Sequence, residues 1–176
     1  MRYMHEGQKI SLDELLKRRD ERQLLSDELS NRFPRTPIIY LTVNIPGPIK
    51  NNPAIERVFD FGVKAINNHL EDNNVTVLDK KEFRLNTGSE YIVVADTDAV
   101  QLKKEMTSIE DSGIGRLLDI DVISEGIQVS RSDLKIEERK CFLCNQNAKL
   151  CARSRKHTLD ELYIWIEKQI DAHLKD

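Results

Sequence analysis

Apolar residues recur at intervals of three and four along several stretches of the chain, which is the spacing of one face of an α-helix. Residues 11–33 carry leucines at this spacing, and Ser11 and Glu14 stand in the positions of a capping box at its start. Thr158 and Glu161 repeat that arrangement near the other end of the chain. The pattern predicts helices over residues 11–33, 52–72, 97–110 and 158–174, the third capped by Thr97 or Asp96.

Runs rich in β-branched and aromatic residues lie between these helices and predict strands. They cover residues 38–43, 75–85, 90–96, 115–124 and 127–130. Gly88 supplies a turn that joins the second and third runs into a hairpin, and Glu125 with Gly126 supplies a tight turn between the last two. Because strict β-α-β alternation is absent, this order indicates an α+β fold with a mixed or antiparallel sheet flanked by helices.

The length of 176 residues fits a single domain spanning residues 1–176. Within it, residues 139–176 form a basic segment that contains the cysteines, followed by the C-terminal helix.

One predicted strand carries two acids on the same face. Asp119 and Asp121 are two residues apart, so their side chains point to one side of the strand, while Leu118, Ile120 and Val122 point to the other. Carboxylates placed in this way repel each other, and they can share Mg²⁺ ions that bridge phosphate oxygens. An exposed strand face whose acids meet only water is the alternative that the pattern leaves open.

The residues just before these acids are rich in glycine. Gly113 and Gly115 permit a close approach of the backbone to a phosphate, and Arg116 can neutralise an oxyanion. Nucleotidyltransferases use a related pattern, a Gly-Gly or Gly-Ser turn followed by an acid-hydrophobic-acid strand. Gly115 lies closer to Asp119 than that pattern requires, so a likeness to the nucleotidyltransferase fold would be distant.

Composition narrows the function classes. The formal net charge of −3 argues against nucleic acid as a partner. No run approaches the roughly 20 apolar residues that a membrane span requires. The N-terminal residues lack the apolar core of a signal peptide, so we expect a cytoplasmic protein.

The last third of the chain carries an excess of cations and every cysteine. Its basic residues suit an acidic partner, although a solvated surface is the alternative; they include Arg139, Lys140, Arg153, Arg155 and Lys156. A C-x2-C-x6-C-x5-H pattern is able to make a tetrahedral Cys₃His zinc site, from Cys141, Cys144, Cys151 and His157. The alternative is three reduced thiols, some of them packed beneath the last helix.

Several ordered motifs carry a resemblance to a known family. They are "NIPGPIKN", "GIGRLLDIDVI", the pair Ser130-Arg131 and "ERKCFLCNQNAKLCARSRKHTLDEL". Together they resemble the holo-citrate lyase synthases, also called apo-citrate lyase phosphoribosyl-dephospho-CoA transferases, whose Pro-Gly-x-x-Lys loop is similar to the first motif. The resemblance extends from about residue 10 to the C-terminus.

This resemblance implies a reaction. It is transfer of the 2′-(5″-phosphoribosyl)-3′-dephospho-CoA group from its triphosphate precursor to a serine of the citrate lyase acyl carrier protein, with release of pyrophosphate. Asp119, Asp121 and Arg116 would be the catalytic residues, with the two acids holding Mg²⁺. The substrate would contact Lys50, Gly113, Gly115 and Arg131. A third metal ligand is left open among Asp96, Asp98 and Glu125.

The implied partner also fits the basic residues. Acyl carrier proteins are typically acidic, so Arg139, Lys140, Arg153, Arg155 and Lys156 would form the docking surface. Two alternatives stay open. One is another nucleotidyltransferase, such as one that serves the carrier protein of malonate decarboxylase, and the other is a zinc-stabilised protein-binding module.

Overall fold

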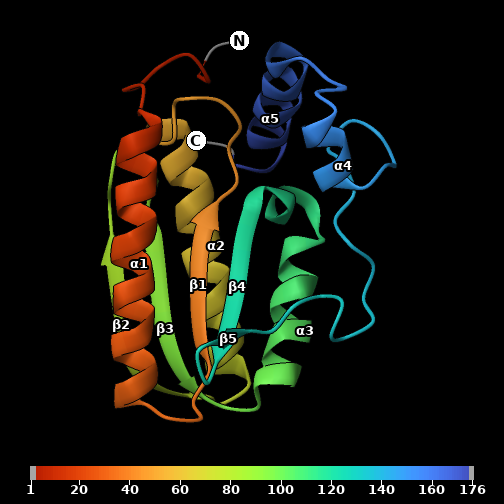
Figure 1. The fold of residues 1–176 in the computed structure, drawn as a ribbon. Helices are drawn as coiled ribbons and strands as arrows, with labels where there is room; N and C mark the ends of the chain where they lie inside the picture. Colours follow the sequence, from red (N-terminus) through yellow and green to blue (C-terminus); the bar gives the residue numbers. More distant parts are fainter. Residues whose placement is uncertain (1–2, 175–176) are drawn as a thin grey trace.

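A five-stranded antiparallel sheet forms the centre of the structure, a computed structural model that describes residues 3–174 (Figure 1). The strand order is β2-β3-β1-β4-β5, and every neighbouring pair is antiparallel. The strands are β1 Ile38–Val43, β2 Thr76–Phe83, β3 Glu90–Asp96, β4 Leu118–Ser124 and β5 Ile127–Gln128. The predicted α+β class is confirmed, and the sheet is the antiparallel one of the two expected kinds.

The helices follow the predicted ranges closely. They are α1 Leu12–Arg32, α2 Pro53–Asp72, α3 Ala99–Glu110, α4 Ala148–Arg153 and α5 Leu159–His173, with a 3-10 helix η1 at Gly113–Leu117. Both predicted capping boxes are present, at Ser11 for α1 and Thr158 for α5. The short helix α4, capped by Asn147, was not predicted.

The predicted cap of α3 was wrong. The helix is capped by Asp98, whose Oδ1 accepts a hydrogen bond from the Gln101 backbone N–H at 2.8 Å, and not by Thr97 or Asp96. Asp98 caps the helix because it directly precedes the first helical residue, and from that position its carboxylate reaches the amide three residues further along the chain.

Helices cover both faces of the sheet. In Figure 1, α1 lies in front of β2 and β3, while α2 lies behind β1 and β4. Leu29 of α1 is buried against Ile38, Tyr40, Ile92 and Val94 on the first face. The larger core lies on the other face, where α2 and α3 bury their apolar stripes against the sheet. Helix α5 adds Tyr163, Ile166 and Ile170 to this core and packs against η1.

Strand β4 alternates between these two environments as predicted. Leu118, Ile120 and Val122 are fully buried in the larger core, whereas Asp119 and Asp121 are only half-buried on the opposite face. That face is the one that α1 covers at β2 and β3. The acids therefore lie on the part of the sheet formed by β1 and β4. In Figure 1, α1 lies in front of β2 and β3, to the side of β4.

Candidate active site and metal cluster

The two acids of β4 stand beside β1. Asp119 lies opposite Thr42 and Asp121 lies opposite Tyr40 in the antiparallel register. Arg139 approaches Asp119 at 3.7 Å, and the Gln128 side-chain amide donates a hydrogen bond to Asp121. Burial, and then the neighbouring charge of Asp119, raise the pKa of Asp121 above its ordinary value. The pair thus carries an electrostatic cost that a bound cation would relieve.

Buried charged side chains hold the backbone between these acids. The Ile120 N–H donates to Glu110 Oε1 at 2.6 Å, and Lys103 Nζ donates to the Ile120 carbonyl at 2.7 Å. Arg139 Nη2 donates to the Leu118 carbonyl at 2.7 Å. Glu110 and Lys103 are 3% and 4% exposed, so these bonds are shielded from water. Because Ile120 separates Asp119 from Asp121, the contacts fix the spacing of the acids.

Sequence reasoning missed Lys103 and Glu110. Both lie on α3, and a separation of seven residues places them on the same side of a helix. That side also buries Leu102 and Met106. A lysine and a glutamate on the same face as these apolar residues could therefore have been used to predict a buried polar contact.

A small pocket of about 220 Å³ opens beside Asp119. Lys50 lines it with Asp119, so two residues predicted from separate motifs meet here. Lys50 Nζ donates to the Ile45 carbonyl at 2.6 Å, and burial lowers its pKa. A half-buried ammonium next to a carboxylate offers both a phosphate contact and a cation-binding oxygen in one small space.

Three further charged residues that we did not predict line the same pocket. They are Arg18, Arg22 and Glu90. Glu90 is 3% exposed and receives two hydrogen bonds from the Arg18 guanidinium. Arg18 and Arg22 are four residues apart, which places both on the side of α1 that faces β3. The spacing of the two arginines was visible in the sequence, but Glu90, the acid that pairs with them, lies on a strand far along the chain.

The glycines before β4 serve local packing. A Cβ at Gly115 would lie 1.9 Å from the Ile109 carbonyl oxygen, so only glycine lets η1 approach the end of α3 this closely. Gly113 has a φ of +49°, in the left-handed region that glycine favours. The sequence suggested that the backbone here approaches a phosphate. At Gly115 the backbone instead approaches the end of α3.

Two arginines predicted at the site have protein partners. Arg116 donates to the carbonyls of Lys140 and Cys141 at 3.2 and 3.1 Å and lies 5.3 Å from the ring centre of Trp165. Arg131, with a side chain only 12% exposed, contacts Glu110 at 2.9 Å and Asp111 at 2.8 Å. Both guanidinium groups join the C-terminal third of the chain to α3, η1 and α5.

The residues predicted to dock a partner differ in exposure. Arg139 is half-buried and paired with Glu110, as well as with Asp119. Lys140, Arg153, Arg155 and Lys156 are exposed. Lys140 precedes α4, Arg153 is its last residue, and Arg155 and Lys156 follow it, so one segment of the chain carries all four exposed cations.

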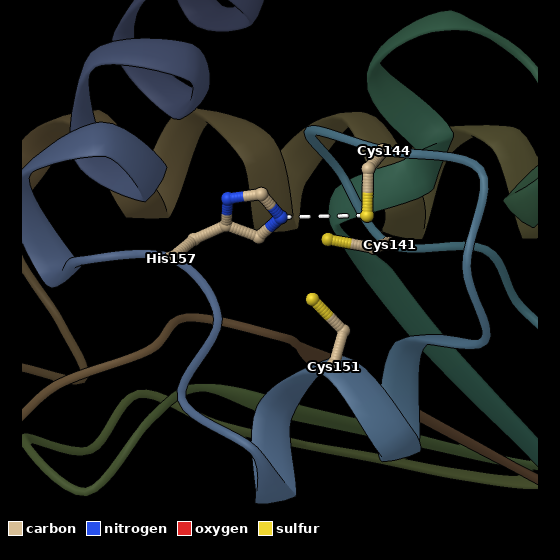
Figure 2. A group of neighbouring side chains, drawn as sticks. All are labelled: Cys141, Cys144, Cys151 and His157. Atoms are coloured by element: carbon tan, nitrogen blue, oxygen red, sulfur yellow. Dashed lines mark hydrogen bonds between the residues drawn. The ribbon is translucent and has the colours of Figure 1, made fainter.

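The three cysteines and His157 converge (Figure 2). Cys141 and Cys144 lie in the coil before α4, Cys151 lies in α4, and His157 precedes α5. One ligand atom from each of the four lies within 4.8 Å of the others, and His157 Nε2 is 3.4 Å from Cys144 Sγ. The hydrogen bond to His157 lowers the pKa of Cys144, while burial and then the neighbouring thiols raise the pKa of Cys151 to about 11. This Cys₃His cluster could hold a metal ion.

Within residues 3–174, this cluster is the one close group of three or more histidine, cysteine, aspartate or glutamate side chains that could hold a metal ion. Among the described residues, Asp119 and Asp121 form no close group of this kind with a third acid or histidine. Of the expected third ligands, Asp98 caps α3 instead.

A larger pocket, of about 1190 Å³, lies under the cluster. Its walls include the four cluster residues together with Arg116, Arg131 and Arg139. Asn44 lines both this pocket and the smaller one beside Asp119. The two spaces are therefore neighbours, separated at the loop that follows β1.

Comparison with known proteins decides the family. Residues 10–173 match the family described as apo-citrate lyase phosphoribosyl-dephospho-CoA transferase. The chain belongs to this family. The resemblance inferred from the motifs is confirmed, and membership places the chain among transferases.

Relatives of this transferase family span most of the chain. A protein of Streptococcus pyogenes serotype M18, named a probable apo-citrate lyase phosphoribosyl-dephospho-CoA transferase, is 37% identical over 169 residues, covering 92% of this chain and 86% of the relative. A protein of the same name from Vibrio cholerae is 35% identical and covers 93% of both. The chain is also 34% identical to Protein CitXG of Haemophilus influenzae, across 96% of its own length and 36% of that protein.

No helix within residues 3–174 of this family member is long and apolar enough to cross a bilayer. The cytoplasmic location and the exclusion of nucleic acid remain predictions.

Proposed function

We propose that this chain transfers the phosphoribosyl-dephospho-CoA group from a triphosphate precursor to a serine of the citrate lyase acyl carrier protein and releases pyrophosphate. Family membership over residues 10–173 carries the proposal, because the names of the relatives state the transferred group and the acceptor enzyme. The acid pair on β4, with Asp119 beside a pocket that contains Lys50, is consistent with such chemistry.

The proposed step is an in-line displacement at the α-phosphorus. The serine oxygen forms the new bond to phosphorus, the bond to the bridging oxygen breaks, and pyrophosphate leaves with the electron pair while the hydroxyl proton is lost to water. Lys50 lines the small pocket with Asp119, and its ammonium has three N–H donors, of which the Ile45 carbonyl takes one, so we assign it to the phosphate oxygens. Arg116 and Arg131 already bind carbonyls and carboxylates, so we assign them to holding η1 and the following segment in place rather than to the phosphates.

We propose Mg²⁺ as the ion that Asp119 and Asp121 hold. Mg²⁺ commonly binds through one or two carboxylates plus the oxygens of a substrate phosphate, so the missing third acid is no obstacle. When bound, it would orient the triphosphate and neutralise the leaving group. The thiolates of the Cys₃His cluster suit Zn²⁺ instead, so the two metals proposed for this chain occupy different places.

The acceptor protein docks, in this proposal, on the exposed cations in and around α4. These are Lys140, Arg153, Arg155 and Lys156. Opposite charge steers a partner and sets its orientation. The larger pocket lies beside this segment, and it shares Asn44 with the small pocket next to Asp119.

Mass spectrometry tests the proposal directly. Apo acyl carrier protein is incubated with the purified chain, the triphosphate precursor and Mg²⁺, and the carrier should gain the mass of the phosphoribosyl-dephospho-CoA group on one serine. Asp119→Asn should fold and abolish the gain, while Lys64→Glu, an exposed change on α2, should preserve it. Absence of any mass gain with the unmodified chain would reject the function. Modification of a malonate decarboxylase carrier in its place would support the alternative acceptor.

A further inference from the structure

We infer that Cys141, Cys144, Cys151 and His157 bind a structural Zn²⁺ ion. The four donor atoms lie within 4.8 Å of one another and point toward a common centre (Figure 2). In a tetrahedral site with Zn–S bonds of about 2.3 Å, neighbouring sulfurs stand about 3.8 Å apart. The separation of 3.4 Å between His157 Nε2 and Cys144 Sγ is close to what such a site requires.

The donor set selects the metal. Three sulfurs and one imidazole are soft ligands in the combination used for zinc, whereas Mg²⁺ and Ca²⁺ require oxygen. All four positions are filled by side chains, which is typical of a structural zinc site, because a catalytic zinc keeps one position open for water or substrate.

The surroundings do not favour three thiols that merely pack in a core. Cys141 and Cys151 are buried, but Cys144 and His157 are only half-buried, and residues 152–156 are exposed throughout. The cysteine segment, residues 139–157, contains one helix of six residues, one isolated antiparallel bridge between Lys140 and Asn147, and otherwise irregular chain. Such a segment cannot bury much apolar surface of its own, so a bound metal is a common means of ordering it.

The cysteine segment is tied to the acid-bearing strand at its first residues. Arg116, at the end of η1, donates to the carbonyls of Lys140 and Cys141. Arg139 donates to the Leu118 carbonyl and approaches Asp119. A metal at the cluster therefore fixes a segment that contacts the backbone of β4 and forms a wall of the larger pocket.

Metal analysis of the full chain provides the first test. Protein produced in zinc-supplemented medium should contain about one zinc per chain. Cys151→Ser and His157→Asn should each lose most of it. His5→Asn, an exposed histidine outside the cluster, should retain it and serves as the matched control.

Cobalt replacement keeps the inference testable even where a variant fails to fold. Unmodified protein reconstituted with Co²⁺ should show the thiolate charge-transfer bands and the intense visible bands of tetrahedral Co²⁺. A zinc content near zero, together with no such spectrum, would overturn the inference. Because neither readout requires transfer activity, a failure of the proposed function would leave this result unaffected, and the reverse also holds.

Discussion

Replacing Asp121 with asparagine should stabilise the protein while it removes transfer activity. The two acids stand two residues apart on one strand, so their backbones are about 6.6 Å apart. Two unit charges at that distance repel by about 0.6 kcal/mol in water and by about 2.5 kcal/mol at an effective dielectric of 20. Since both side chains are half-buried, and Asp119 is 49% exposed, the lower part of this range applies.

The expected gain for Asp121→Asn is therefore about 1 kcal/mol at neutral pH, which raises the Tm by about 2–4 °C in a chain of this length. Asparagine can still accept the hydrogen bond from Gln128, so the substitution removes charge with little change in packing. Transfer should be lost, because one of the two oxygen ligands proposed for Mg²⁺ becomes neutral.

The pH dependence follows from the raised pKa of Asp121. The folded protein holds this proton more tightly than the unfolded chain does, so the unmodified protein loses stability as pH rises from the ordinary aspartate pKa to the raised folded value. The gain from Asp121→Asn should thus be small in acid and full at neutral pH.

Urea unfolding at both pH values, without Mg²⁺, measures this difference. Asp119→Asn is the matched control, since it removes the same repulsion but also the contact with Arg139, and its gain should be smaller. If Asp121→Asn folds but is less stable than the unmodified protein at neutral pH, the account of the acid pair is refuted.

Three other variants probe the supports and the surface of the site. Glu110→Gln leaves two arginines without their shared buried carboxylate and should cost about 3–5 kcal/mol in urea unfolding. Gly115→Ala forces a Cβ against the Ile109 carbonyl and should cost about 1–3 kcal/mol in the same assay. Arg153→Glu with Arg155→Glu should weaken binding of the carrier protein, measured by calorimetry, more than binding of the triphosphate precursor.

Each of these three predictions can be contradicted by a defined experimental result. The charge reversal is matched by Lys64→Glu with Lys104→Glu, two exposed changes on α2 and α3 that alter the net charge equally. Equal weakening by both pairs would assign the effect to net charge rather than to a docking surface. Unfolding curves for Glu110→Gln or Gly115→Ala that coincide with that of the unmodified chain would contradict the packing described for β4 and η1.

Local patterns predicted the parts of the fold that depend on neighbours in sequence. The capping boxes at Ser11 and Thr158 involve residues three apart, and the alternation that exposes Asp119 and Asp121 is a property of any strand. The spacing of the cysteines also anticipated their convergence, because the four potential ligands lie within a short stretch of chain.

Local sequence patterns did not predict the contacts between elements that are far apart in the chain. The pocket beside Asp119 combines Arg18 of α1, Glu90 of β3 and Lys50 of a loop, and their meeting depends on the strand order β2-β3-β1-β4-β5. The role of Glu110 depends likewise on where α3 packs. Helix α4 was missed because six residues are too few to show a helical period.

The charged groups along β4 have a consequence for how copies of this protein behave toward one another. β5 pairs with β4 only at Ile123 and Ser124, so the first part of β4 would otherwise present free amides and carbonyls along one side. Exposed strands of this kind recruit strands from other molecules and begin aggregation. Lys103, Glu110 and Arg139 occupy those positions with side chains that no incoming strand can easily displace. The same three residues that space the acids thus protect the protein from assembling through its own sheet.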